Sequence, residues 1–64
     1  MKRNAFGELL TVEEVAAMLR RTPAALRYQI HMGTAPKSAI IMGRRMFRRE
    51  DVEAHIAAAF EGVA

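Results

Sequence analysis

Residues 11–33 read TVEEVAAMLRRTPAALRYQIHMG and carry the start and stop signals of two helices. Thr11 and Glu14 have the spacing of a capping box, in which each side chain can bond the backbone amide of the other residue. Apolar residues then recur at helical spacing. We therefore expect the first helix to begin after Thr11 and to end near Leu19 or Arg20.

A second helix is predicted to follow at once. Thr22 is a favourable cap, and Pro23 suits the first position of a helix, where its missing N–H is not needed. We expect this helix to reach about Met32, because Gly33 readily adopts the positive φ that ends many helices. Only two residues separate the first helix from Thr22. So short a connection makes two helices cross steeply, as in a helix-turn-helix.

The next segment, residues 39–48, reads AIIMGRRMFR and is rich in residues that favour strands. It predicts a short hairpin whose basic tip holds Arg44 and Arg45 after a flexible glycine. Two strands alone are not stable in water. We therefore expect Ile41 and Phe47, or their neighbours, to pack on the helices, so that the hairpin forms a wing.

A last helix is predicted after the wing, with Arg48 or Arg49 at its cap. Acidic residues at positions 50, 51 and 53 would lie in its first turn, where the helix dipole favours negative charge. Apolar residues at helical spacing predict a core face made of Val52, Ile56, Ala59 and Phe60.

These elements predict a mostly α protein with a small β-hairpin, a winged helix-turn-helix in the order helix, turn, helix, wing, helix. We expect residues 1–64 to form a single winged helix-turn-helix domain, because 64 residues leave no room for a second one. Its ordered core should span about residues 9–60, with frayed ends at residues 1–7 and 62–64. The five Met residues are expected to fill gaps in the core.

The composition excludes several classes of protein. The absence of Cys excludes disulfide frameworks, zinc sites with thiolate ligands and thiol nucleophiles. The sequence has no Ser-His-acid pattern and no Gly-rich phosphate loop, so we expect neither an enzyme nor a small-molecule ligand. His31 and His55 fall on different helices, and we expect no metal and no cofactor. No apolar run approaches a membrane span and no secretory signal is apparent, which predicts no membrane partner and a cytoplasmic, nucleoid-associated location.

Charge is segregated along the chain. Residues 20–49 hold eight cationic side chains and no acidic one, whereas the flanking segments hold all seven acidic residues. A single-sign stretch creates a potential that attracts a polyanion. Seven of the eight cations are arginines, whose planar donors suit phosphate oxygens and guanine edges. The stretch therefore predicts double-stranded DNA as the partner.

The second helix and the wing are the two elements that would reach DNA, through a major groove and the neighbouring backbone or minor groove. The helix face opposite Leu26 and Ile30 supplies most of the candidates. Arg27 is the strongest of them and could contact either a guanine edge or a phosphate. The candidate DNA-binding residues are Arg20, Arg21, Thr22, Pro23, Ala24, Arg27, Tyr28, His31, Arg44, Arg45 and Arg48.

Two of these residues have an alternative role. The Tyr28 hydroxyl could donate to a phosphate, or its ring could pack between the helix and the wing. Arg48, like its neighbour Arg49, could instead pair with Glu50, Asp51 or Glu53 at the start of the last helix.

The order of these motifs resembles the small winged helix-turn-helix proteins that include phage excisionases, over about residues 9–60. The resemblance rests on residues 10–16 (LTVEEVA), residues 22–28 (TPAALRY), Gly33, Pro36, and the two segments at 43–45 (GRR) and 49–52 (REDV). The segment ALRY at 25–28 also resembles the recognition helix of the mercury-resistance regulator (MerR) family. This chain departs from the pattern in the turn, where Arg20 replaces the usual Gly and Arg21 the usual apolar residue.

The resemblance implies a recombination directionality factor, an accessory protein that bends DNA and directs a separate integrase toward excisive DNA recombination. It also implies adjacent copies on tandem DNA sites. The absence of a long helix after Phe60 argues against a complete MerR-type regulator. Two alternatives are a small transcription regulator of the same fold and a basic protein-interaction module.

Overall fold

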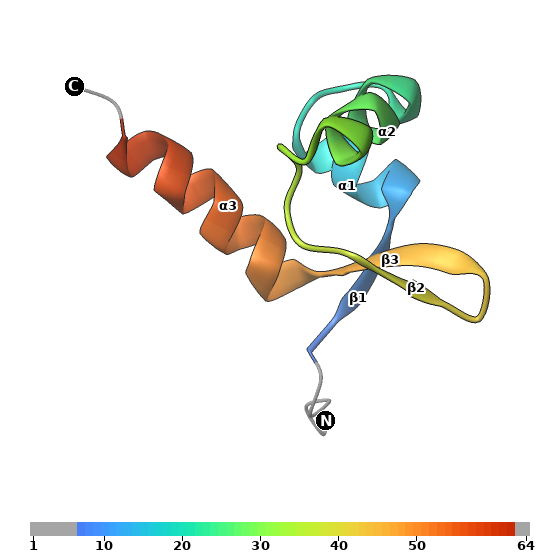
Figure 1. Cartoon of the computed structure of the whole chain (residues 1–64). Coiled ribbons are helices and arrows are strands. Elements are labelled where there is room, and N and C mark those ends of the chain that lie inside the picture. The colour runs from blue at the N-terminus through green and yellow to red at the C-terminus, as the bar shows by residue number, and fades with distance from the viewer. Residues whose placement is uncertain (1–6, 63–64) are drawn as a thin grey trace.

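The computed structural model describes residues 7–62, which form three helices and three strands (Figure 1). The elements are β1 (Leu9–Thr11), α1 (Val12–Met18), α2 (Pro23–Met32), β2 (Ala39–Ile41), β3 (Arg44–Arg48) and α3 (Arg49–Glu61). The predicted winged helix-turn-helix is confirmed, with one strand that was not predicted. The predicted fraying of the ends lies, except for Gly7 and Gly62, outside the described residues.

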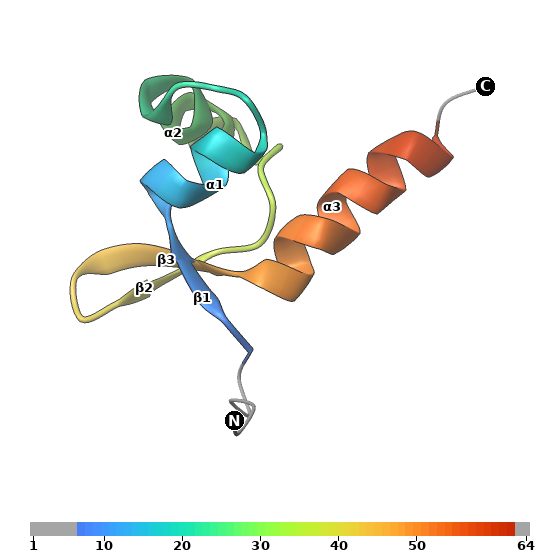
Figure 2. The same ribbon diagram turned by 180° about the vertical axis from the view of Figure 1, so that it is seen from behind.

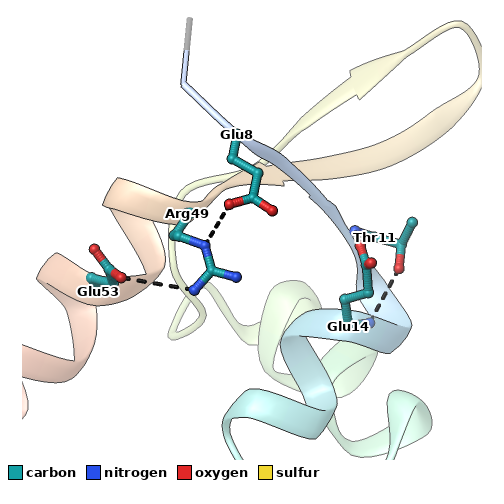
Figure 3. Close-up of polar contacts among 5 residues, drawn as sticks. All are labelled: Glu8, Thr11, Glu14, Arg49 and Glu53. Carbon is teal, nitrogen blue, oxygen red and sulfur yellow. Dashed lines mark hydrogen bonds and ion pairs between the residues drawn. The ribbon is translucent and has the colours of Figure 1, made fainter. Parts of the chain in front are cut away.

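Helix α1 begins as the capping box predicts. The Thr11 hydroxyl accepts from the Glu14 amide at 3.1 Å, and the Glu14 carboxylate accepts from the Thr11 amide at 2.8 Å (Figure 3). Two donors at the helix start are thereby satisfied. Thr11 is also the last residue of β1, so the strand passes into the helix with no residue between them.

The turn between the two helices contains an arginine in a left-handed conformation, because Arg20 has a φ of 59°. The Arg20 amide donates to the Ala17 carbonyl at 3.1 Å, and the Arg21 amide donates to the Ala16 carbonyl at 2.8 Å. These two bonds form a Schellman motif, in which glycine is the usual left-handed residue. Arg20, where this chain departs from the family pattern, is therefore a residue whose backbone conformation is unfavourable.

Helix α2 has the predicted bounds. The Thr22 hydroxyl accepts from the Ala25 amide at 3.1 Å, and Pro23 occupies the first helical position. Gly33 ends the helix with a φ of 78°. The signals at both ends of this helix were therefore interpreted correctly.

The three strands form one antiparallel sheet in the order β1-β3-β2. Strand β3 is central, with Leu10 opposite Phe47 on one side and Ile41 opposite Arg44 on the other. Strand β1 was not predicted, because three residues are too few to show an alternating pattern. It converts the hairpin into a sheet that contacts α1 directly.

The tip of the wing differs from the prediction. Its two turn residues are Met42 and Gly43, with φ values of 50° and 81°, whereas Arg44 and Arg45 already belong to β3. A two-residue hairpin turn of this kind needs a positive φ at both positions, which moves the tip toward the N-terminal side of the arginines.

The core is a single cluster to which every element except β2 contributes. Its buried members are Leu10, Val12, Val15, Ala16, Leu26, Phe47 and Val52. Phe47 thus packs as predicted, but Ile41 is exposed. The expectation that Met residues fill the core is wrong for Met32 and Met42, which are exposed.

Helix α3 projects away from the rest of the molecule (Figure 2). Val52 is fully buried and Ile56 packs against the core, but Ala59 is exposed and Phe60 is 75% exposed. The predicted core face is therefore right for the first half of the helix and wrong for the second. Helical spacing identifies an apolar face, but a second element must be present to bury it.

Candidate DNA interface

An open groove of about 560 Å³ lies between α2 and the wing. Its walls are the start of α1, the exposed side of α2 and the first residues of β3. The lining residues are Thr11, Val12, Glu13, Arg27, Ile30, His31, Gly43, Arg44 and Arg45. Four residues predicted from the sequence to bind DNA, on α2 and on β3, are thereby brought to one surface.

Arg27 and His31 lie one helical turn apart on α2, and both are exposed. Their helix buries Leu26 against the core, with Ile30 partly buried beside it. Because side chains four residues apart share a helix face, the two basic residues point to the same side of α2. That side faces the groove.

An acidic residue that the sequence analysis missed also lines the groove. Glu13 Oε2 accepts from Arg27 Nη2 at 3.2 Å, and both side chains are 57% exposed. A hydrogen bond from its own backbone amide lowers the pKa of Glu13, and the Arg27 guanidinium lowers it further, with a smaller effect from Arg44. The only signal in the sequence was that Glu14 serves the capping box, which leaves Glu13 free for another partner.

Arg45 lines the groove, but a hydrogen bond to Ser38 holds its guanidinium. Its Nη1 donates to the Ser38 hydroxyl at 2.6 Å, and its side chain is partly buried. The bond ties β3 to the residue before β2. Arg44, by contrast, is exposed at the first position of β3.

Arg48 lies away from the groove. Its Nε donates to Asp51 Oδ2 at 2.8 Å, and this bond raises the pKa of Arg48. Together with Leu9 and Met46 it lines a hollow on another side of the sheet. Arg48 is the last residue of β3, at the end of the strand away from the turn that borders the groove. The ion pair predicted as the alternative role of Arg48 is the one present.

Arg49 forms a second link to acidic residues. Its Nε donates to Glu8 Oε1 at 2.7 Å, and its Nη1 lies 3.8 Å from Glu53 Oε2 (Figure 3). The Glu8 bond raises the pKa of Arg49, and the Arg49 amide donates to the Glu8 carbonyl at 2.8 Å. The pair with Glu53 was predicted as an alternative, and the pair with Glu8 was not predicted.

The family of the chain follows from a comparison with known domains. A family model described as a helix-turn-helix domain matches residues 9–59, which include the groove and all six elements except the end of α3. The chain belongs to this helix-turn-helix family. Helix-turn-helix domains bind double-stranded DNA through the second helix of the motif, which here is α2. Comparison with curated proteins and with solved structures gave no significant match.

The remaining predicted contacts of this helix-turn-helix domain lie outside the groove. Ala24 and Tyr28 are exposed on α2, and an exposure of 59% shows that the Tyr28 ring does not pack between α2 and the wing. Thr22 and Pro23 start the helix. Arg20 is exposed in the turn, whereas Arg21 lines a separate hollow with Ala25 and His55.

Within residues 7–62, ion pairs occupy Arg27, Arg48 and Arg49. The five cations of the basic stretch that have no acidic partner within 4.0 Å in this part of the chain are Arg20, Arg21, Lys37, Arg44 and Arg45. These five could neutralise phosphates without breaking an ion pair of the described residues, although Arg45 is hydrogen-bonded to Ser38.

Clusters of metal ligands and membrane-spanning helices are absent from the residues that the structure describes. Among those that the structure describes, no three His, Asp or Glu side chains gather as a metal site would require. None of their helices is long and apolar enough to span a membrane.

Proposed function

We propose that this helix-turn-helix protein is a DNA-bending accessory protein of the excisionase type, a recombination directionality factor of phage DNA that directs a separate integrase toward excision. The observation that carries the proposal is the groove flanked by two basic elements, with Arg27 and His31 on α2 and Arg44 on β3. Two elements on one side of a small domain can hold a major groove and its flank together.

In this proposal α2 enters the major groove. Arg27 contacts a guanine edge or a phosphate, and Ala24, Tyr28 and His31 lie on the same exposed side of the helix. Thr22 and Pro23 would approach the DNA at the start of α2, where backbone amides suit a phosphate.

The cations of the turn and the wing would contact the backbone on either side of α2. Arg20 and Arg21 serve the flank next to the turn, and Arg44 with Arg45 serves the flank next to the wing. These contacts neutralise charge and position the domain without reading sequence.

Adjacent copies bound to the DNA are proposed to supply together the free energy that bends it. Bending a site of 20 to 30 base pairs costs of order 1–6 kcal/mol, which is large for one module of this size. The exposed Phe60 and its neighbour Glu61, which forms no ion pair among the described residues, offer an apolar and negatively charged surface at the end of α3. The basic stretch of a second copy is its electrostatic complement.

The test starts from the DNA that the protein selects. Fragments of the source genome recovered on the purified protein should contain an attachment region, and the integrase encoded beside that region should excise its target only when this protein is added. Recovery of promoter fragments with no effect on excision would instead assign the chain to transcription regulators of the same fold. Absence of any DNA binding would favour the basic protein-interaction module and overturn the proposal.

A further inference from the structure

The tip of the wing is apolar rather than basic. Met42 is 97% exposed, Ile40 is 59% exposed and Ile41 is 41% exposed. In Figure 1 the turn between β2 and β3 lies on the side of the molecule opposite α3. The tip is therefore a short apolar projection free of the protein's own core.

The fold gives no reason for a methionine at this position. Met42 has a φ of 50°, in the left-handed region that Asn, Asp and Gly tolerate and that longer side chains rarely adopt. Its side chain is almost fully exposed, so it gains almost no burial in return. Residues held in disfavoured backbone conformations cluster at functional positions.

The position of the tip relative to the groove indicates what it would meet. Gly43 and Arg44, the next two residues, line the groove together with Arg27. DNA whose phosphates contact Arg44 would bring its adjacent groove against the turn. The positive charge beside the tip is complementary to a polyanion, and the nearest acidic residue of the groove, Glu13, is already paired with Arg27.

We propose that Met42 is a wedge that enters the minor groove of double-stranded DNA and unstacks one base step. Proteins that bend DNA from the minor groove insert apolar side chains such as Met and Ile between base steps and kink the duplex by roughly 20–90°. The inference rests on the proposed function, because it assigns the bend of that proposal to a particular side chain. Arg44 holds the backbone beside the kink.

The experiment compares two substitutions at one position. Met42→Asn removes the apolar wedge but supplies a residue that tolerates the left-handed turn, so the variant should melt no lower than the parent protein. Met42→Leu keeps an apolar side chain of similar size at the same backbone strain and is the matched control. The probe is a duplex of about 30 base pairs selected from a random pool by the parent protein.

Two readouts report on the wedge. The mobility of circularly permuted fragments measures the bend, and permanganate reactivity of thymines measures unstacking. Met42→Asn should lose at least half of the bend and the reactive thymine, with less than about a tenfold loss of affinity because the arginine contacts remain. Met42→Leu should keep both signals.

The outcomes separate the wedge from the proposed function. A bend of parental size in Met42→Asn, or an equal loss of the bend in Met42→Leu, overturns the wedge and leaves the proposed function in place. Loss only of the cooperation between adjacent copies would make the tip a protein contact and also overturns the wedge. If the parent protein bound no duplex from the pool, the proposed function itself would fail.

Discussion

Arg27 on α2 donates to Glu13 on α1 across 3.2 Å, and this contact places the one carboxylate of the groove among its cations. The residue best placed to read DNA is therefore already paired with a carboxylate. In the proposed complex Arg27 would contact a base or a phosphate through its remaining donors or in exchange for this partner, and Glu13 would lie close to a polyanion. We expect the pair to lower the affinity of the surface for DNA while it orients the arginine.

Replacement of Glu13 by Gln should tighten binding to all DNA. The substitution removes a negative charge from the groove and frees Arg27, and one exposed charge interaction corresponds to about a twofold to fivefold change in affinity. Gel-shift titrations on a selected site and on random DNA measure it. Glu61→Gln, with the same change of net charge near the end of α3, is the control and should have less effect.

The same carboxylate gives a pH dependence of stability. Its pKa in the folded protein lies below the ordinary value of 4.5, so its stabilising contribution is complete above pH 4.5 and is lost as the pH falls through the lowered pKa. Melting temperatures of the parent protein and of Glu13→Gln should therefore converge on acidification. The difference at neutral pH should be small, since both partners are exposed. A gap that widens at low pH would contradict the assigned sign.

Arg20 is predicted to lower the stability of the fold and to raise the affinity for DNA. Arg20→Gly relieves the left-handed arginine and should raise the free energy of unfolding by about 0.5–1 kcal/mol, after the greater freedom of glycine in the unfolded chain is counted. The same change should remove one phosphate contact. Arg20→Ala keeps the strained conformation and should gain no stability, so that urea unfolding of the two variants distinguishes relief of strain from removal of charge.

Binding should depend steeply on salt. If the five arginines of the proposed surface, Arg20, Arg21, Arg27, Arg44 and Arg45, each neutralise a phosphate, the logarithm of affinity should fall with the logarithm of salt concentration at a slope of about −4 to −5. A titration between low and physiological salt measures the slope. A slope near zero is incompatible with the proposed surface.

Substitutions in α2 and in the wing should weaken DNA binding in different ways. Arg27→Ala should cost about 1–3 kcal/mol on the selected site, and less on random DNA, if the residue reads a base. Arg44→Ala should weaken both DNAs alike and lower the salt slope by about one. An equal loss on both DNAs for Arg27→Ala would assign that arginine to a phosphate.

The helix starts and stops were predictable because their signals are local. Thr11, Thr22 and Gly33 act on amides and carbonyls within one turn, and sequence spacing determines those partners. The wing was predictable as a hairpin but not in its exact tip, since Met42 is not a residue expected at positive φ.

The parts that were not predicted depend on contacts between distant segments. Leu10 forms a strand only because Phe47, far along the chain, supplies its partner. Glu13 and Arg27 meet because two helices cross, and Phe60 stays exposed because no element covers it. Spacing along a sequence carries no information on such partners.

Thr11 ends β1 and caps α1, and β1 pairs along β3, so the wing and the helix pair are joined without a hinge. We expect the distance between α2 and the wing to stay nearly fixed on binding, so that a duplex that fits poorly would have to deform. Sequences that deform at low cost, such as those with pyrimidine–purine steps between the contacted positions, would be bound in preference. We therefore expect the protein to select DNA partly by how easily it deforms, at base pairs that no side chain touches.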